Sequence, residues 1–129
     1  METLPHYLAY LGSALGILVI FAVLYQLVTP WNEMALIRNG NKAAAISLSG
    51  TLVGFGLALG GAVSESEVLW EVLLWGAIAL MSQVIAFVAV TTLIRDFRTG
   101  IESDKQSYGI LLAAISIAVG LINAGALTY

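Results

Sequence analysis

Four long apolar runs divide this chain, and each is long enough to cross a lipid bilayer. The runs cover about residues 8–28, 43–63, 72–93 and 108–127. At about 1.5 Å of rise per residue, a helix of about twenty residues spans the roughly 30 Å of hydrocarbon in a membrane. Hydrophobic residues make up 60% of the 129 residues and charged residues 10%, which is unlike a water-soluble domain. The sequence therefore predicts an all-α bundle of four transmembrane helices, forming a single integral membrane domain over residues 1–129.

The basic residues set the predicted orientation. All five lie in the first and third connections between the apolar runs: Arg38, Lys42, Arg95, Arg98 and Lys105. Short loops rich in Lys and Arg stay on the cytoplasmic side, so we expect both termini to lie outside. Four acidic residues then lie outside without basic neighbours: Glu2, Glu65, Glu67 and Glu71. They can attract cations or a basic partner, although solvated carboxylates are the simpler interpretation.

The two halves of the chain share a layout that indicates an internal duplication. A shift of 64 positions aligns the second run with the fourth, and it pairs Ile46 with Ile110, Gly56 with Gly120, Leu57 with Leu121, Gly61 with Gly125 and Ala62 with Ala126. Each half reads as apolar run, charged connection and glycine-rich run. We therefore predict two tandem helical hairpins, residues 1–64 and 65–129, that enter the membrane in the same direction as a parallel repeat.

Both basic connections contain turn and capping residues. In the first, Pro30 ends or kinks the preceding helix, Asn39-Gly40 favours a tight turn, and Asn41 can cap the second span. In the second, Ser103 or Asp104 can cap the fourth span, and Gln106 can complete a capping box.

Small residues at four-residue spacing mark candidate helix contacts. Such residues let two backbones approach closely in a membrane, where lipid removes most of the hydrophobic drive for association. The candidates for helix packing are Gly12 and Gly16, Gly50 and Gly54, Gly56 and Gly60, and Gly120. They serve either packing within the four-helix bundle, which is the simpler interpretation, or contacts between copies of the chain.

Polar side chains inside the spans are costly in lipid and must face protein or water. Gln83 and Asn123 lie well within the third and fourth runs, and they serve either structural hydrogen bonds or an internal path. No charged side chain lies near the middle of a run, which argues against a proton-coupled pump.

The two basic connections are also the candidate interaction or gating region. The candidate residues are Trp31, Glu33, Arg38, Asp96 and Arg98. Met34 and Ile37 add apolar surface beside Trp31, while Tyr25, Trp31 and Tyr108 are expected to anchor the chain at the interface. Salt bridges are the simpler role for the two acids, which can pair with Arg38, Arg95 or Arg98.

Enzyme chemistry finds little support in the sequence. The chain has no cysteine, and its single histidine, His6, lies at the edge of the first run without neighbouring metal ligands. We expect no catalytic residue, no cofactor, no metal site and no nucleic-acid partner.

Several stretches resemble the YjfL-like family of bacterial inner-membrane proteins, also known as domain of unknown function 350. The stretches are Thr29-Pro30 followed by Glu33, residues 40–46 (GNKAAAI), Gly50 with Gly54-Phe55-Gly56, and residues 118–124 (AVGLINA). The second half departs from the pattern, with residues 103–106 (SDKQ) in place of another Gly-Asn-x-Ala-Ala stretch. The resemblance implies a multi-pass protein of the bacterial inner membrane that works beside membrane-associated partners, including proteins similar to phage-shock coat proteins. It implies no established activity.

Two functional hypotheses follow. The first is a non-enzymatic, self-associating membrane component that acts as a scaffold in the lipid bilayer and docks a cytoplasmic or peripheral membrane protein. The alternative is a passive ion or small-solute channel formed between several copies.

Overall fold

The computed structural model describes residues 3–29 and 31–127, and within them it contains four long helices and two short ones. The long helices are α1 (Thr3–Val28), α3 (Lys42–Glu65), α4 (Leu69–Leu93) and α6 (Gln106–Ala126). All four are long and apolar enough to cross a membrane, which confirms the predicted all-α class and the four spans. The short helices α2 (Glu33–Arg38) and α5 (Phe97–Glu102) occupy the two basic connections. The predictions for Glu2 and Pro30 lie outside the described residues.

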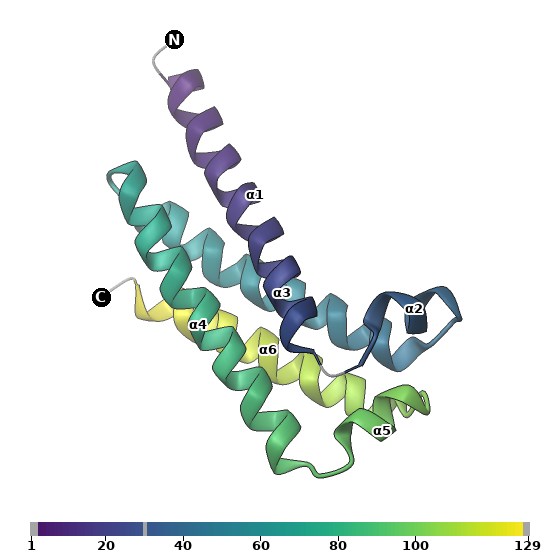
Figure 1. Cartoon of the computed structure of the whole chain (residues 1–129). Helices are drawn as coiled ribbons and strands as arrows, with labels where there is room; N and C mark the ends of the chain where they lie inside the picture. The colour runs from purple at the N-terminus through teal and green to yellow at the C-terminus, as the bar shows by residue number, and fades with distance from the viewer. Residues whose placement is uncertain (1–2, 30, 128–129) are drawn as a thin grey trace.

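The helices give the molecule two chemically different ends. Figure 1 shows α2 and α5 together at one end, and both chain termini with the α3–α4 turn toward the other. The first end carries all five Lys and Arg residues in α2, α5 and the segments around them, and we call it the basic end. We call the opposite end, with Thr3, the turn around Ser66 and Ala126, the terminal end.

Helices α3 and α6 form the tightest contact in the bundle, and glycine makes it possible. A methyl group added at Gly50 would overlap Ala113, and one added at Gly54 or Gly120 would overlap the backbone of the facing helix. Near the terminal end, a Cβ on Gly61 would lie 2.7 Å from the Cβ of Ala124. These contacts run in the same order along both helices, so α3 and α6 are parallel.

The spacing of these contacts varies around the 64-position shift of the predicted duplication. Gly50 faces Ala113 and Gly61 faces Ala124, and each pair is separated by 63 positions (113 − 50 and 124 − 61). Gly54 faces Gly120, 66 positions away (120 − 54), whereas Gly56, which the 64-residue shift pairs with Gly120, faces open space. The duplication itself stays a prediction.

Aromatic side chains hold α1 to the bundle in its second half. Phe21 stacks on Phe55 of α3 with ring centroids 4.2 Å apart, and Tyr25 meets the edge of Phe87 of α4 at 5.0 Å. Toward the terminal end, α1 diverges from α3 and α4 (Figure 1), and from Thr3 to Gly12 every side chain except Tyr10 is exposed. Helix α1 is therefore anchored at the basic end and loosely held at the terminal end.

The start of α3 joins the two basic connections. Asn41 Oδ1 accepts a hydrogen bond from Ala44 N at 2.8 Å, which confirms the predicted cap. Asp104 Oδ1 accepts from Ala43 N at 2.8 Å, so a residue of the second connection caps the helix that follows the first. The predicted capping of the fourth span by Ser103 or Asp104, with Gln106 in a capping box, is wrong. Asp104 has φ 60°, which turns its carboxylate to α3, and the N-cap of α6 is Lys105, whose side chain makes no capping bond.

Candidate functional site

A buried carboxylate lies beneath the surface of the basic end. Glu33 is the first residue of α2 and has no exposed surface. Its Oε2 accepts a hydrogen bond from Trp31 Nε1 at 2.6 Å. Trp31 is itself 3% exposed and lies between Phe87 of α4 and Phe97 of α5, at ring distances of 5.7 and 5.8 Å. Trp31 and Glu33 thus form one buried unit that packs against two other helices.

Burial changes the acidity of Glu33. Removal from water raises its pKa from 4.5 to about 7, because the charged form loses hydration, while the bond from Trp31 lowers the pKa by a smaller amount. Its Oε1 has no hydrogen-bond partner among the described residues. Near neutral pH, this carboxyl therefore exists both with and without its proton.

The predicted ion pairs of the two acids are wrong. Glu33 bonds to Trp31, whereas Arg38 is exposed at the far end of α2. Asp96 accepts from the Tyr108 hydroxyl at 3.2 and 3.3 Å. Arg98 instead forms an exposed ion pair with Glu102 at 3.4 Å, because residues four apart on a helix are neighbours.

A row of polar side chains runs from near the basic end to the middle of the bundle. We call it the buried polar row, and its members, each at most 2% exposed, are Tyr25, Ser47, Thr51, Ser116 and Gln83. Tyr25 Oη lies 3.3 Å from Ser47 Oγ, and Thr51 Oγ1 donates to Ser47 O at 2.8 Å and lies 3.5 Å from Ser116 Oγ. Gln83 Nε2 donates to Ser116 O at 3.0 Å. The row takes members from α1, α3, α4 and α6, and so connects all four spans.

The structure separates the two amides that the sequence suggests. Gln83 belongs to the buried polar row, and its Oε1 has no partner among the described residues. Asn123 is half-buried and lies seven positions beyond Ser116, about 10 Å along α6. The two amides therefore do not form one site within a single copy.

The candidate glycines fall into two groups. Gly50, Gly54 and Gly120 lie within the α3–α6 contact. At Gly12, Gly16, Gly56 and Gly60, an added Cβ would meet no atom within 4 Å. The second group leaves open surface on α1 and α3, where another molecule can approach.

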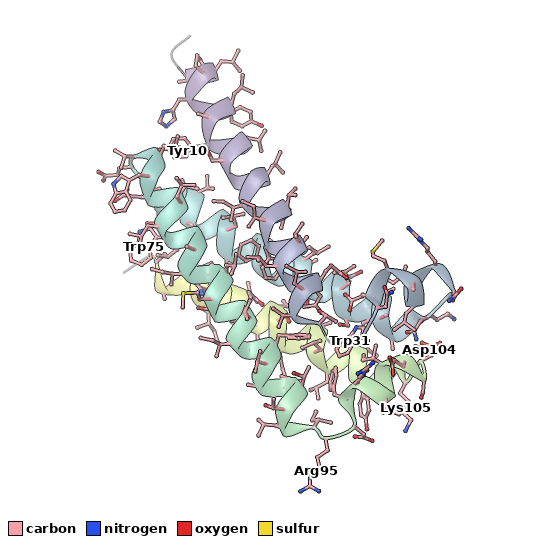
Figure 2. All side chains as sticks on the ribbon, in the orientation of Figure 1. Tyr10, Trp31, Trp75, Arg95, Asp104 and Lys105 are labelled. Carbon is pink, nitrogen blue, oxygen red and sulfur yellow. The ribbon has the colours of Figure 1, made fainter. Side chains whose placement is uncertain are left out.

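Sequence reasoning missed the roles of Tyr25 and Asp104. Tyr25 was expected at the interface but is 2% exposed, and Trp31 is likewise buried rather than anchored at a surface. A signal existed for Tyr25, since it follows Phe21 by four positions and the two ring centroids lie 6.0 Å apart on one side of α1. No local pattern identifies Asp104, because its partner is 61 positions away. Figure 2 shows Trp31 and Asp104 within the basic end, while the side chains of Arg95 and Lys105 at the same end point outward.

Comparison with known proteins agrees with this architecture. Residues 1–127 match the family described as Domain of Unknown Function (DUF350). The chain is 30% identical to the UPF0719 inner membrane protein YjfL of Escherichia coli (strain K12) over 129 residues, which cover 100% of this chain and 98% of that protein. It is 25% identical to the UPF0719 transmembrane protein YshE of Bacillus subtilis (strain 168) over 118 residues, which cover 90% and 88% of the two chains. No solved structure matches with significance. The predicted resemblance is confirmed, and the chain belongs to the DUF350 family of integral membrane proteins.

Proposed function

We propose that this protein is a non-enzymatic membrane scaffold that associates with copies of itself and presents its basic end to a cytoplasmic or peripheral membrane protein. The proposal depends on one observation, that hydrogen bonds connect the two basic connections to each other. Asn41 Nδ2 donates to Ile101 O at 2.8 Å, and Asp104 accepts from Ala43 N at 2.8 Å. Segments about sixty positions apart thus form one fixed surface, which is what a docking partner requires.

The exposed chemistry of the basic end indicates the kind of partner. Arg38, Lys42, Arg95, Arg98 and Lys105 are all exposed, and Met34 of α2 is 48% exposed beside them. An acidic protein surface with an apolar contact complements this combination. Trp31 supports the surface from below and does not reach the partner. The positive-inside rule supports a cytoplasmic basic end.

Site-specific crosslinking tests the docking surface. A photoreactive amino acid at Met34 is expected to capture a protein partner in intact cells, whereas the same group at Trp70, 61% exposed at the terminal end, is expected to capture no cytoplasmic protein. Arg38→Glu is expected to remove the Met34 product, because it reverses a charge on the same short helix. A Met34 product that persists unchanged in Arg38→Glu would contradict a charge-guided docking surface.

The open glycines of α1 support the self-association part of the proposal. Gly12 and Gly16 lie on the same face of α1, and an added Cβ at either would meet no atom within 4 Å, which leaves a small-residue surface for close approach by a second copy. Native mass spectrometry from lipid discs is expected to show oligomers for the wild type and monomers for Gly16→Leu. Gly56→Leu on α3 is the matched control, because it also enters open space, and it is expected to keep the oligomer. A monomeric wild type would exclude this part of the proposal.

A passive channel is the second candidate, and the buried polar row is the observation that favours it. The row lies inside one bundle, and the Gln83 amide is bonded to Ser116 O, so we expect no conduction. Flux of K⁺ from liposomes that hold the purified protein distinguishes the two functions. K⁺ flux that the wild type shows and that disappears in Gln83→Leu or Asn123→Leu would favour the channel function over the scaffold function.

A further inference from the structure

An apolar groove runs between the diverging half of α1 and the second half of α3. It has a volume of about 370 Å³, and its walls include Leu11, Leu15 and Leu18 of α1. Gly56 and Gly60 of α3 form its floor, where their missing side chains leave the space open. The groove lies between two membrane-spanning helices, so its occupant must be apolar over this length.

The groove continues into a more polar mouth at the terminal end. The mouth shares Tyr7, Tyr10 and Val63 with the groove and adds Thr3, His6 and Ser66. The groove is apolar along its length and ends in hydroxyl and imidazole groups. A membrane lipid has the same order, with apolar acyl chains and a polar head group.

Tyr10 lies where the groove meets the mouth, and it has an unsatisfied polar group. The residue is 8% exposed, and its ring is tilted by 30° to that of His6 with centroids 4.3 Å apart. Its hydroxyl is buried and has no hydrogen-bond partner within the described part of the chain. A buried hydroxyl without a partner is unfavourable, so this position is suited to a ligand that offers a donor or an acceptor.

The length of the groove fits one lipid acyl chain. From Tyr7 to Leu18 the groove follows α1 for eleven positions, about 16 Å, which equals about half of the roughly 30 Å hydrocarbon thickness. The apolar walls over this length suit the acyl chain of a lipid in that leaflet.

The charges of the terminal end select the head group. Glu65, Glu67 and Glu71 lie at this end, whereas all five Lys and Arg side chains lie at the basic end. This distribution attracts an ammonium group and repels a lipid with net negative charge. We propose that the groove binds one phospholipid with a primary ammonium head group, with an acyl chain over Gly56 and Gly60 and the head group beside Tyr10.

Lipid retention tests the proposal directly. The protein is reconstituted into vesicles of equal parts phosphatidylethanolamine and phosphatidylglycerol, extracted in mild detergent, and examined by native mass spectrometry. We expect one retained phosphatidylethanolamine per chain. Gly60→Leu fills the floor of the groove without meeting another atom at its Cβ, and it is expected to lower retention by about tenfold. Ala77→Leu on α4, an exposed position that does not line the groove, is expected to retain the lipid.

The same experiment contains the results that overturn the proposal. If Gly60→Leu retained as much phosphatidylethanolamine as the wild type, the groove would be excluded as the site. A preference of the wild type for phosphatidylglycerol would exclude the assigned head group. Loss of oligomers in Gly60→Leu with unchanged lipid would mean that a second copy occupies the groove. Tyr10→Phe keeps the ring and removes the hydroxyl, so reduced preference for phosphatidylethanolamine in this variant would support the head-group position. Circular dichroism and the thermal midpoint verify that each variant is folded.

Discussion

Glu33 combines complete burial with a carboxyl group that is only half satisfied. Its Oε2 is bonded to Trp31, its Oε1 has no partner among the described residues, and its pKa is raised to about 7 by burial. A buried charge without a counter-ion is costly, so the protein folds more readily when this carboxyl holds its proton. The stability of the basic end therefore depends on pH close to neutrality.

This dependence gives a prediction with a definite sign. Because the folded-state pKa of about 7 exceeds the ordinary 4.5, the stabilisation from protonation is complete below about pH 4.5 and is lost as the pH rises through about 7. The difference corresponds to about 3 kcal/mol in the free energy of unfolding. Glu33→Gln is expected to remove this dependence and raise the thermal midpoint at pH 8, measured in detergent at pH 5 and pH 8.

Glu102→Gln serves as the control for that measurement, since Glu102 is exposed and its charge is solvated. It is expected to leave the pH dependence of the wild type unchanged. If Glu33→Gln lost as much stability between pH 5 and pH 8 as the wild type does, another group would be responsible.

The capping of α3 by Asp104 gives a second prediction. Its carboxylate caps α3 from the opposite connection, and removal of a capping side chain costs about 1 kcal/mol. Asp104→Ala is expected to lower the free energy of unfolding by about that amount. Asp104→Asn keeps an acceptor oxygen and tolerates positive φ, so its loss should be smaller. Chemical denaturation in detergent compares the two variants, and equal losses would contradict the capping role.

At the scale of helices, the contact between α3 and α6 decides the arrangement of the bundle. Gly54 and Gly120 lie so close that no side chain fits between the two backbones. Gly56, two positions further along α3, faces open space instead. Two glycines in one helix therefore have opposite structural requirements.

This contrast predicts opposite effects of the same substitution. Gly54→Ala is expected to destabilise the protein by about 1–3 kcal/mol, because the methyl group forces the helices apart. Gly56→Ala is expected to be neutral or to stabilise by up to about 1 kcal/mol, since alanine favours the helix and meets nothing. Unfolding by increasing SDS in mixed micelles measures both. A loss in Gly56→Ala as large as that in Gly54→Ala would contradict the assignment of the two faces.

The helices also show how far the sequence predicts this structure. The four spans were predicted within a few residues, because twenty-residue apolar runs have a direct physical meaning in lipid. The short helices α2 and α5 were expected only as turns, since six residues give too little periodicity to recognise. The buried unit of Trp31 and Glu33 was missed because Trp31 packs against Phe87 and Phe97, which are distant in the sequence.

For the whole molecule, the proposed orientation can be tested without removing any native thiol, because the chain has no cysteine. Glu67→Cys lies at the terminal end and Ser103→Cys at the basic end, and both positions are exposed. With the basic end in the cytoplasm, an impermeant maleimide is expected to label Glu67→Cys in intact cells and Ser103→Cys only after permeabilisation. The reverse pattern would place the termini inside.

The glycine contact between α3 and α6 also constrains how a ribosome can produce this protein. Gly54 and its partner Gly120 are 66 positions apart (120 − 54), so at about 5–20 residues per second the partner follows several seconds later. During synthesis, the face of α3 that later packs against α6 is exposed to lipid or to the insertion machinery. A nascent chain halted before α6 emerges would therefore expose the glycine face of α3 to other helices in the membrane.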